Sequence, residues 1–425
     1  MRKKLTSSIQ EPSLSLWSLQ NDTLCVSAEM SNATLTCIDL WIKAGSLYEE
    51  NGEEGIAHFL EHMVFKGGSH LKEGDFDRKI EALGGSSNAA TGFDDVHFHV
   101  LVPAESVEPA INLLVNLVLE PTFDSNAFEI ERQVVLEEIA QHKDQPDEQI
   151  FQELLEICWE GHPYSRPILG FKKSLLEISP FNMKSFHKRL YTGGNCTISI
   201  AGIIPDNIQT IINKSILSNL NKTPIEEKLS PRKKINLCFK KEYREISLPR
   251  IESSRLIMAW PIPPAKKQSF LIGADIATSL LAEGRRSRLV KHLREDLQIV
   301  ESIEMDITIL EEGGLVLLEA LCQEKNLKQV EEEIHLVLKN SLNDPIEVQE
   351  IMRAHQLVKN SFYFNLEAST NVASAIGGQT LWGRHQSLLE PLKHIDTWSI
   401  EKLKQEILVT LQPEKSSTLI VRPKK

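Results

Sequence analysis

The sequence lacks any apolar run as long as the roughly 18 residues that a membrane-spanning helix needs. Its basic beginning, with Arg2, Lys3 and Lys4, is not followed by the apolar core of a secretory signal. Basic residues are also too few to favour a nucleic acid as partner, because 47 Lys and Arg stand against 59 Asp and Glu, for a net charge of -12. We therefore expect a cytoplasmic protein that binds neither membrane nor nucleic acid.

Cysteine is scarce and scattered. The six cysteines form no Cys-x-x-Cys pair, which argues against a cysteine metal cluster and a disulfide framework; they are Cys25, Cys37, Cys158, Cys196, Cys238 and Cys322. We expect reduced, mostly buried thiols. The composition, with 41% apolar and 25% charged residues, is that of a globular protein, and 425 residues are too many for one ordinary core. At least two domains are expected.

One stretch carries most of the chemical information. Residues 55–68 read Gly-Ile-Ala-His-Phe-Leu-Glu-His-Met-Val-Phe-Lys-Gly-Gly, which predicts a short apolar helix bounded by glycines. At about 100° per residue, His58, Glu61 and His62 fall on one face of this helix. Because its other sides are apolar, we expect the helix to be buried and its polar face to meet a specific partner or a cleft.

Histidines at positions i and i+4 of a helix can bind one zinc ion through neutral imidazole nitrogens at about 2.1 Å. Glu61, beside the second histidine, could then accept a proton from a metal-bound water. The pattern His-x-x-Glu-His is the inverted form of the commoner zinc-peptidase motif. The alternative is that these are ordinary histidines of an amphipathic helix, because a five-residue pattern also arises by chance.

A zinc peptidase needs a third protein ligand and leaves a fourth position for water. Residues 125–143 predict a second helix, with Phe128, Val134, Val135 and Ile139 as its apolar positions. Glu131 and Glu138 are seven residues apart, and therefore lie on one face of that helix.

These two segments together resemble a known family. His-x-x-Glu-His at 58–62, followed by Glu-Arg-x-Val-x-Leu-x-Glu at 131–138, is similar to the pitrilysin/insulinase family of zinc peptidases, which includes the mitochondrial processing peptidases. In that family the third ligand lies about 76 residues beyond the second histidine, and Glu138 lies 76 residues after His62. The resemblance thus implies one Zn²⁺ per chain held by His58, His62 and Glu138. It implies Glu61 as general base and Glu131 as a supporting carboxylate.

The resemblance extends to other segments. Residues 83–91, Leu-Gly-Gly-Ser-Ser-Asn-Ala-Ala-Thr, are similar to the family segment that forms a sheet edge where substrate backbone pairs, which implies Asn88 and Ala89 as substrate-binding residues. Residues 161–170 and 190–195 also match family landmarks. The implied activity is that of an endopeptidase acting on peptides or unfolded segments held in extended form.

The second half of the chain weakly repeats the first, at an offset near 220. Residues 255–262 correspond to the apolar strand at 36–42, and 275–282 correspond to 55–62, which puts Thr278, Leu281 and Ala282 where the motif residues were. Prolines and basic residues between 221 and 250 predict a linker. We expect an α+β protein with two homologous α/β domains, at 1–220 and 251–425. Each would hold a mostly antiparallel sheet packed with helices, the two would face across a cleft, and the second would lack the metal site.

One family feature is missing. Members often carry an Arg and a Tyr, seven residues apart, in the second domain to hold substrate backbone, and neither occurs at that spacing in residues 367–382. Three explanations stay open: a homologous subunit in a homodimer or heterodimer supplies them, the alignment has slipped, or Trp382 and its neighbours take the role. Two rival functions also stay open, a non-catalytic scaffold or partner subunit and a structural zinc site closed by a fourth ligand.

A second pair of histidines lies on a predicted strand at 94–102, where His97 and His99 share one face. Two strand histidines without a third ligand nearby are more typical of packing or hydrogen bonding than of metal binding.

Overall fold

The computed structural model describes residues 11–223 and 235–424. The basic cluster at Arg2, Lys3 and Lys4 and residues 224–234 of the predicted linker lie outside the described residues. The chain forms two compact units, and each combines distant segments. The first consists of Met1–Glu137, Ile168–Lys234 and Phe362–Leu389, and the second of Glu138–Pro167, Ile235–Ser361 and Glu390–Lys425. The domain limits at 220 and 250 stay a prediction.

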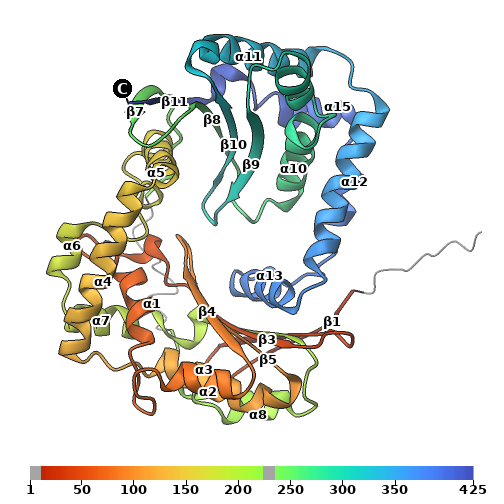
Figure 1. Cartoon of the computed structure of the whole chain (residues 1–425). Helices are drawn as coiled ribbons and strands as arrows, with labels where there is room; N and C mark the ends of the chain where they lie inside the picture. The colour runs from red at the N-terminus through yellow and green to blue at the C-terminus, as the bar shows by residue number, and fades with distance from the viewer. Residues whose placement is uncertain (1–10, 224–234, 425) are drawn as a thin grey trace, which may run out of the picture. The chain divides into compact units, whose positions relative to one another are not determined.

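The first unit is built on a six-stranded sheet with the order β1-β2-β6-β3-β5-β4. Its strands are β1 (Ser13–Ser18), β2 (Leu24–Glu29), β3 (Thr36–Ile42), β4 (Ser86–Thr91), β5 (Val96–Val102) and β6 (Cys196–Gly202). The pair β2 and β6 is parallel and the other neighbours are antiparallel. The sheet therefore ends at β4, which contacts α1 (Ile56–Val64), the helix that carries the histidine motif (Figure 1).

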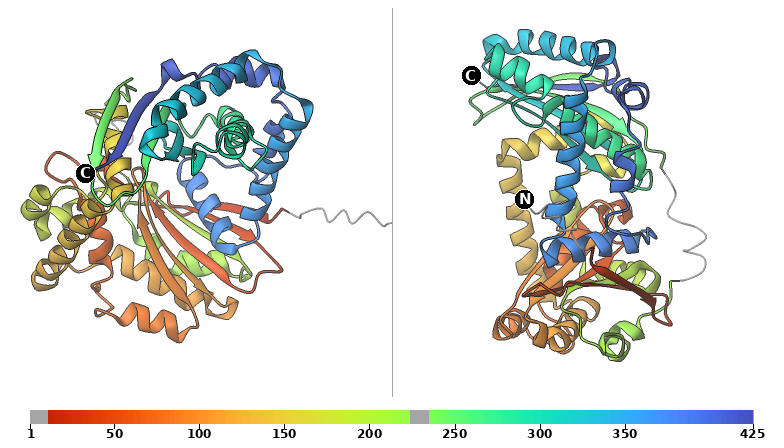
Figure 2. Two further views of the ribbon diagram at one scale, coloured as in Figure 1. Left: turned by 45° about the horizontal axis from the view of Figure 1, so that its top comes forward. Right: turned by 90° about the vertical axis from the view of Figure 1, so that its right-hand side faces the viewer.

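Helices cover both faces of this sheet. They are α1 (Ile56–Val64), α2 (Asp75–Ala82), α3 (Val107–Leu119), α6 (Lys172–Glu177), α7 (Pro180–Leu190), α8 (Ile208–Lys214), most of α4 (Ser125–Asp144) and α13 (Ser369–Leu381). α13 lies along the face formed by β2, β6 and β3 (Figure 2), where the Ser199 hydroxyl donates a hydrogen bond of 2.8 Å to the Ala373 carbonyl. The opposite face packs against α3 and the apolar side of α1. The apolar residues of α1 are thus buried, and this packing fixes the helix that carries the histidine motif.

The second unit holds a five-stranded sheet with the order β7-β11-β8-β10-β9. Its strands are β7 (Tyr243–Leu248), β8 (Ser254–Ile262), β9 (Ser302–Ile309), β10 (Gly314–Cys322) and β11 (Ser417–Pro423). Its helices include α5 (Pro146–Trp159), α10 (Gln268–Ala282), α11 (Leu327–Asn343), most of α12 (Val348–Asn365), α14 (Leu392–Ile395) and α15 (Ile400–Lys402). α5 contacts β11, and the carbonyl of Cys158 in its last turn accepts a 2.9 Å hydrogen bond from the amide of Lys240, shortly before β7.

Apart from the edge strand β1, which has no counterpart in the second sheet, the two sheets share one topology. This confirms the predicted α+β class with two similar domains. In each, the first strand of the repeat (β2 or β7) runs parallel to the last (β6 or β11), and the remaining neighbours are antiparallel. Each unit also contains a helix from the other half of the chain: α13 in the first and α5 in the second. These helices begin at 369 and 146, an offset of 223, so they are equivalent parts of the repeat.

Local expectations hold within a few residues. The helix expected within residues 55–68 is α1, which runs from Ile56 to Val64, and the helix expected at 125–143 is α4, which runs from Ser125 to Asp144. On α4, Phe128 and Val135 are buried as expected, but Val134 is 44% exposed and does not belong to the core. All six cysteines are free thiols, five of them buried. Among the described residues, no helix is long and apolar enough to cross a membrane.

Candidate metal centre

The motif helix α1 is fixed at its start by a glycine and a buried carboxyl group. Gly55 has φ +95°, and a Cβ there would lie 2.5 Å from the Leu169 carbonyl oxygen, so only glycine fits without strain. The Glu49 carboxyl accepts hydrogen bonds from the amides of Gly55 (3.1 Å) and Ala57 (3.0 Å). Burial raises the pKa of Glu49 to about 8, although these two hydrogen bonds act in the opposite direction. The first turn of α1 is therefore rigidly held.

α1 brings its two histidines together, and α4 adds a carboxylate. The rings of His58 and His62 lie edge to face with centroids 4.7 Å apart. One nitrogen of each ring and one carboxylate oxygen of Glu138 all lie within 4.8 Å of one another. Tetrahedral zinc ligands at 2.0–2.1 Å are about 3.4 Å apart, a separation within this limit. The sequence positions 58, 62 and 138 thus meet in space.

Glu131, one heptad before Glu138 on α4, contacts the site from behind. Its Oε1 lies 2.8 Å from Nδ1 of His62, and its Oε2 lies 2.7 Å from Nζ of Lys66. With Nδ1 donating to this buried carboxylate, His62 presents the lone pair of Nε2. Burial lowers the pKa of Lys66, but the hydrogen bonds to Glu131 and Glu73 outweigh it and raise the pKa overall. No sequence pattern points to Lys66 as a site residue, because only its contact with Glu131 in the folded chain places it there.

The side chain of Glu61, on α1, contacts the end of the edge strand β4. The hydroxyl of Thr91, the last residue of β4, donates a hydrogen bond to Oε2 of Glu61. Asn88 and Ala89 lie on the same strand, with Asn88 exposed and Ala89 half-buried. In the part of the chain that the structure describes, β4 pairs only with β5, so its other edge has no strand beside it. The motif carboxylate and a free strand edge are therefore neighbours.

The equivalent helix of the second unit carries no such chemistry. Thr278, Leu281 and Ala282, the counterparts of the motif residues, are all buried in α10. Residues 367–382, which lack the Arg and Tyr of other family members, contain α13. A Cβ on Gly377 of this helix would lie 2.5 Å from the indole of Trp41 on β3. Trp382 donates from Nε1 to Oδ2 of Asp95 at 2.9 Å. The stretch 367–382 thus packs against the first sheet.

The three groups gathered from α1 and α4 suit a zinc ion by their chemistry. Two imidazoles and one carboxylate are the protein ligands of catalytic zinc sites, which keep a further position for water. A carboxylate that accepts Nδ1–H fixes the orientation of a metal-binding histidine, and Glu131 has that contact with His62. The residues present therefore fit the metal that the sequence motif implies.

Two family models together match residues 24–172 and 177–358 of the chain. The model described as "Insulinase (Peptidase family M16)" matches residues 24–172, and the "Peptidase M16 inactive domain" matches 177–358. An "Uncharacterized zinc protease" of Rickettsia felis is 26% identical over 361 residues, covering 84% of this chain and 85% of the relative. The mitochondrial-processing peptidase subunit beta of Lentinula edodes is 24% identical over 417 residues, with 95% and 89% covered.

Solved structures share the fold. A protease from Helicobacter pylori superimposes with a TM-score of 0.87 at 22% identity, covering 97% of this chain and 100% of that one. The first matched model includes both α1 and α4, and the second includes α10, whose buried Thr278, Leu281 and Ala282 offer no metal ligand set like that of α1. From this succession of two matched domains we conclude that the chain belongs to the insulinase, or M16, family of peptidases.

Proposed function

We propose that the protein is a zinc-dependent endopeptidase that hydrolyses peptides or unfolded protein segments. The observation that carries the proposal is the group formed by His58, His62 and Glu138, whose ligand atoms lie within 4.8 Å of one another. Glu61 belongs to the same helix as the two histidines, one residue before the second. A metal site with an adjacent carboxylate is the arrangement that hydrolysis of a peptide bond by activated water requires.

His58, His62 and Glu138 would hold one Zn²⁺, with His62 oriented by Glu131. When bound, zinc lowers the pKa of its water towards about 7 and polarises the scissile carbonyl. Glu61 takes a proton from the attacking water on its carboxylate and later delivers that proton to the leaving amine nitrogen. The hydrogen bond from Thr91 holds the Glu61 carboxylate towards the end of β4, next to the strand edge where the peptide would lie.

The substrate would bind as an added strand on β4. The edge of β4 that faces away from β5 has backbone groups available for an extended peptide. Asn88 and Ala89 lie in the middle of this strand and would pair with substrate backbone. Backbone pairing gives affinity with little dependence on the substrate sequence, so extended or unfolded segments are the substrate class.

The test is the substitution Glu61→Gln, which removes the proton acceptor and keeps the shape of the side chain. Because Glu61 is not one of the three grouped ligands, the variant should bind Zn²⁺ like the wild type. Its cleavage of a quenched peptide should fall at least about 100-fold, the contribution of a general base. Glu81→Gln, at an exposed position on α2, is the matched control and should change neither property.

Two results would count against the proposal. A wild-type protein that binds Zn²⁺ with full occupancy and cleaves no peptide would favour the non-catalytic scaffold. A Glu61→Gln variant that cleaves at the wild-type rate would exclude Glu61 as the base. A structural zinc site is usually closed by a fourth protein ligand, and among the described residues the group at α1 and α4 has three.

A second candidate, activity only as part of a pair of homologous subunits, is favoured by one observation. The stretch 367–382 has no Arg and Tyr at the family spacing, and its helix α13 packs on the first sheet. A relative that covers nearly the same length is itself described as a subunit. The native mass of the assembly isolated from its own cell separates the cases, because a homodimer, a heterodimer and a monomer differ in mass and in the number of distinct chains.

A further inference from the structure

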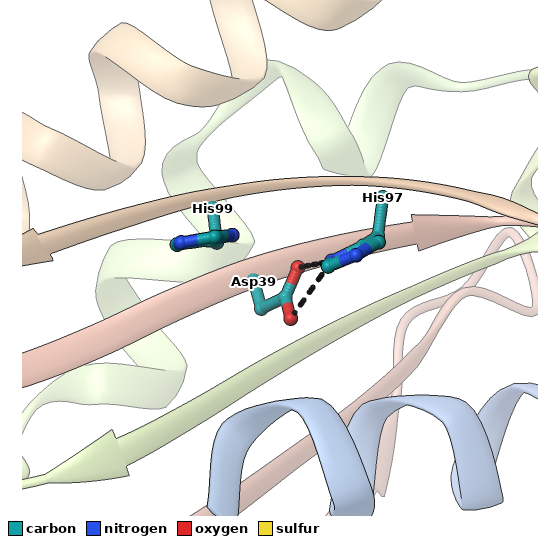
Figure 3. A group of neighbouring side chains, drawn as sticks. All are labelled: Asp39, His97 and His99. Atoms are coloured by element: carbon teal, nitrogen blue, oxygen red, sulfur yellow. Dashed lines mark hydrogen bonds and ion pairs between the residues drawn. The ribbon is translucent and has the colours of Figure 1, made fainter. Parts of the chain in front are cut away.

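We propose that Asp39, His97 and His99 form a second binding site for a divalent transition-metal ion, separate from the group on α1 and α4. These residues come from two neighbouring strands, β3 and β5, and from no helix. One ligand atom of each lies within 4.8 Å of the other two, the same limit that the first group meets. Figure 3 shows the three side chains on the same side of the sheet.

The strand register brings these side chains together. In the antiparallel pair β3 and β5, Asp39 is directly opposite His99, and Trp41 is opposite His97. Residues opposite each other, and residues two apart on one strand, point to the same face of a sheet. The pairing of β3 with β5 therefore brings Asp39, 58 residues before His97 in the sequence, next to the two histidines as a third ligand.

The carboxylate of this group is buried and already oriented. Asp39 has a side chain only 2% exposed, and its two oxygens lie 3.0 and 3.2 Å from Nδ1 of His97. The His97 ring is stacked on Trp41, with centroids 4.2 Å apart and planes 12° from parallel. A buried carboxylate needs a positive partner, which a metal ion or a protonated imidazole supplies. The packing holds two of the three ligands in place before any metal arrives.

His99 is what distinguishes a metal site from a simple ion pair. If the group existed only to neutralise Asp39, His97 alone would suffice. Among the described residues, His99 has no hydrogen bond or ion pair, and its ring lies parallel to that of His97 at 5.8 Å. As a neutral imidazole, His99 would offer a ring-nitrogen lone pair to a metal ion.

The donor set indicates the class of ion. Two imidazoles and one carboxylate suit Zn²⁺, Co²⁺ and similar first-row ions, and are poor for Mg²⁺ or Ca²⁺, which prefer oxygen ligands. With three protein ligands, further positions remain for water or a ligand atom from outside the chain. The exposed residue Asn88, opposite His99 on β4, lies on the same face of the sheet.

The experiment counts metal ions. Protein stripped with a chelator is titrated with Zn²⁺ alone, and the bound ions per chain are counted by native mass spectrometry. The wild type should reach two, and His99→Gln and Asp39→Asn should each reach one. The double variant His58→Ala/His62→Ala should also reach one, because it loses the other site. Combining His99→Gln with this double variant should leave none.

The control addresses adventitious binding to surface histidines. His70→Gln changes an exposed histidine that also has a carboxylate neighbour, Glu120, at 3.2 Å, and it should leave the count at two. Thermal unfolding of each variant without metal shows whether that variant folds. Because His99→Gln and Asp39→Asn change two different ligands, the conclusion does not depend on a single variant. A wild-type count of one, or a count of two that His99→Gln and Asp39→Asn leave unchanged, would overturn the second site without affecting the first.

Discussion

At the scale of single residues, Glu131 makes a prediction that separates support of the metal from catalysis. It contacts Nδ1 of His62 and Nζ of Lys66 and is not among the three grouped ligands. We expect Glu131→Gln to weaken Zn²⁺ binding at this site by about 10- to 100-fold, the usual effect of losing a carboxylate behind a metal-binding histidine. Competition with a chelator of known affinity measures the change.

The matched control for Glu131 is on the same helix. Glu137→Gln removes an exposed carboxylate of α4 and should leave zinc affinity unaltered. At saturating Zn²⁺, Glu131→Gln should regain most of its peptide cleavage, whereas Glu61→Gln should not. If Glu131→Gln binds Zn²⁺ as tightly as the wild type, the contact with His62 does not orient the ligand.

Glu49 makes a prediction about stability and pH. Its pKa is about 8 in the folded protein against an ordinary 4.5, so the folded state keeps this proton where the unfolded state has released it. The free energy of unfolding should therefore fall, by an amount on the order of a few kcal/mol, as the pH rises from 4.5 to 8, and this contribution should level off above 8. Glu49→Gln should remove this part of the slope.

Urea unfolding of the wild type and of Glu49→Gln across that pH range tests the slope. The amide can still accept one backbone hydrogen bond but loses the second, so the variant should be less stable at low pH and approach the wild type as the pH rises. Glu81→Gln, an exposed carboxylate, should run parallel to the wild type throughout. A difference between wild type and Glu49→Gln that is constant with pH would show that Glu49 is ionised in the folded state.

The candidate site was only partly accessible from the sequence. His58, Glu61 and His62 lie within one helical turn, so their common face follows from helix geometry alone. The choice of Glu138 came from the family spacing, because no local rule joins residues 76 positions apart. Asp39 could not be found at all, since its contact with His97 exists only through the register of β3 and β5.

At the scale of elements, α1 depends on a close approach between two glycines. A Cβ on Gly55 would lie 2.5 Å from the Leu169 carbonyl oxygen and 3.0 Å from the Cα of Gly170. We expect Gly55→Ala to lower the free energy of unfolding by more than the roughly 1–2 kcal/mol that a positive φ alone costs. It should also weaken Zn²⁺ binding, because α1 must shift to relieve the contact. Thermal unfolding and zinc titration measure the two effects.

Gly52→Ala is the control for Gly55→Ala. Gly52 has nearly the same φ, +91° against +95°, but a Cβ there meets nothing within 4 Å. It should therefore show the backbone strain alone and retain zinc affinity. Equal loss of stability in both variants would mean that the contact with Leu169 and Gly170 relaxes freely and does not position α1.

Most elements could be predicted because their signals are local. The apolar periodicity of α1 and the glycines that flank it, Gly55 and Gly67, lie within the helix or next to it. The place of α13 could not be predicted, because its sequence gives an ordinary helix and nothing in it names the sheet that it covers. Val134 was misjudged for a related reason: apolar character alone does not say which side of α4 meets the core.

At the scale of the whole molecule, each half of the chain supplies one helix to the unit built mainly from the other half. α13 brings Val372, Ala373 and Ile376 into a core with Val26 and Ala28 of the first sheet. α5 joins the second unit, where Glu153 forms a 3.1 Å ion pair with Arg244 at the start of β7. A half expressed alone therefore exposes an apolar sheet face and carries a helix with no sheet to cover.

This exchange predicts that the halves assemble when the chain is cut. Residues 1–223 and 235–425, produced together as two chains, should purify as a 1:1 complex, whereas 1–223 alone should aggregate or unfold at a lower temperature. Gly377→Ala in the second chain puts a Cβ 2.5 Å from Trp41 and should reduce the yield of complex. Gly378→Ala meets Trp41 at 3.8 Å, an ordinary contact distance, and should not. Two halves that purify separately, each with the unfolding temperature of the intact chain, would show that α5 and α13 are dispensable for the units they join.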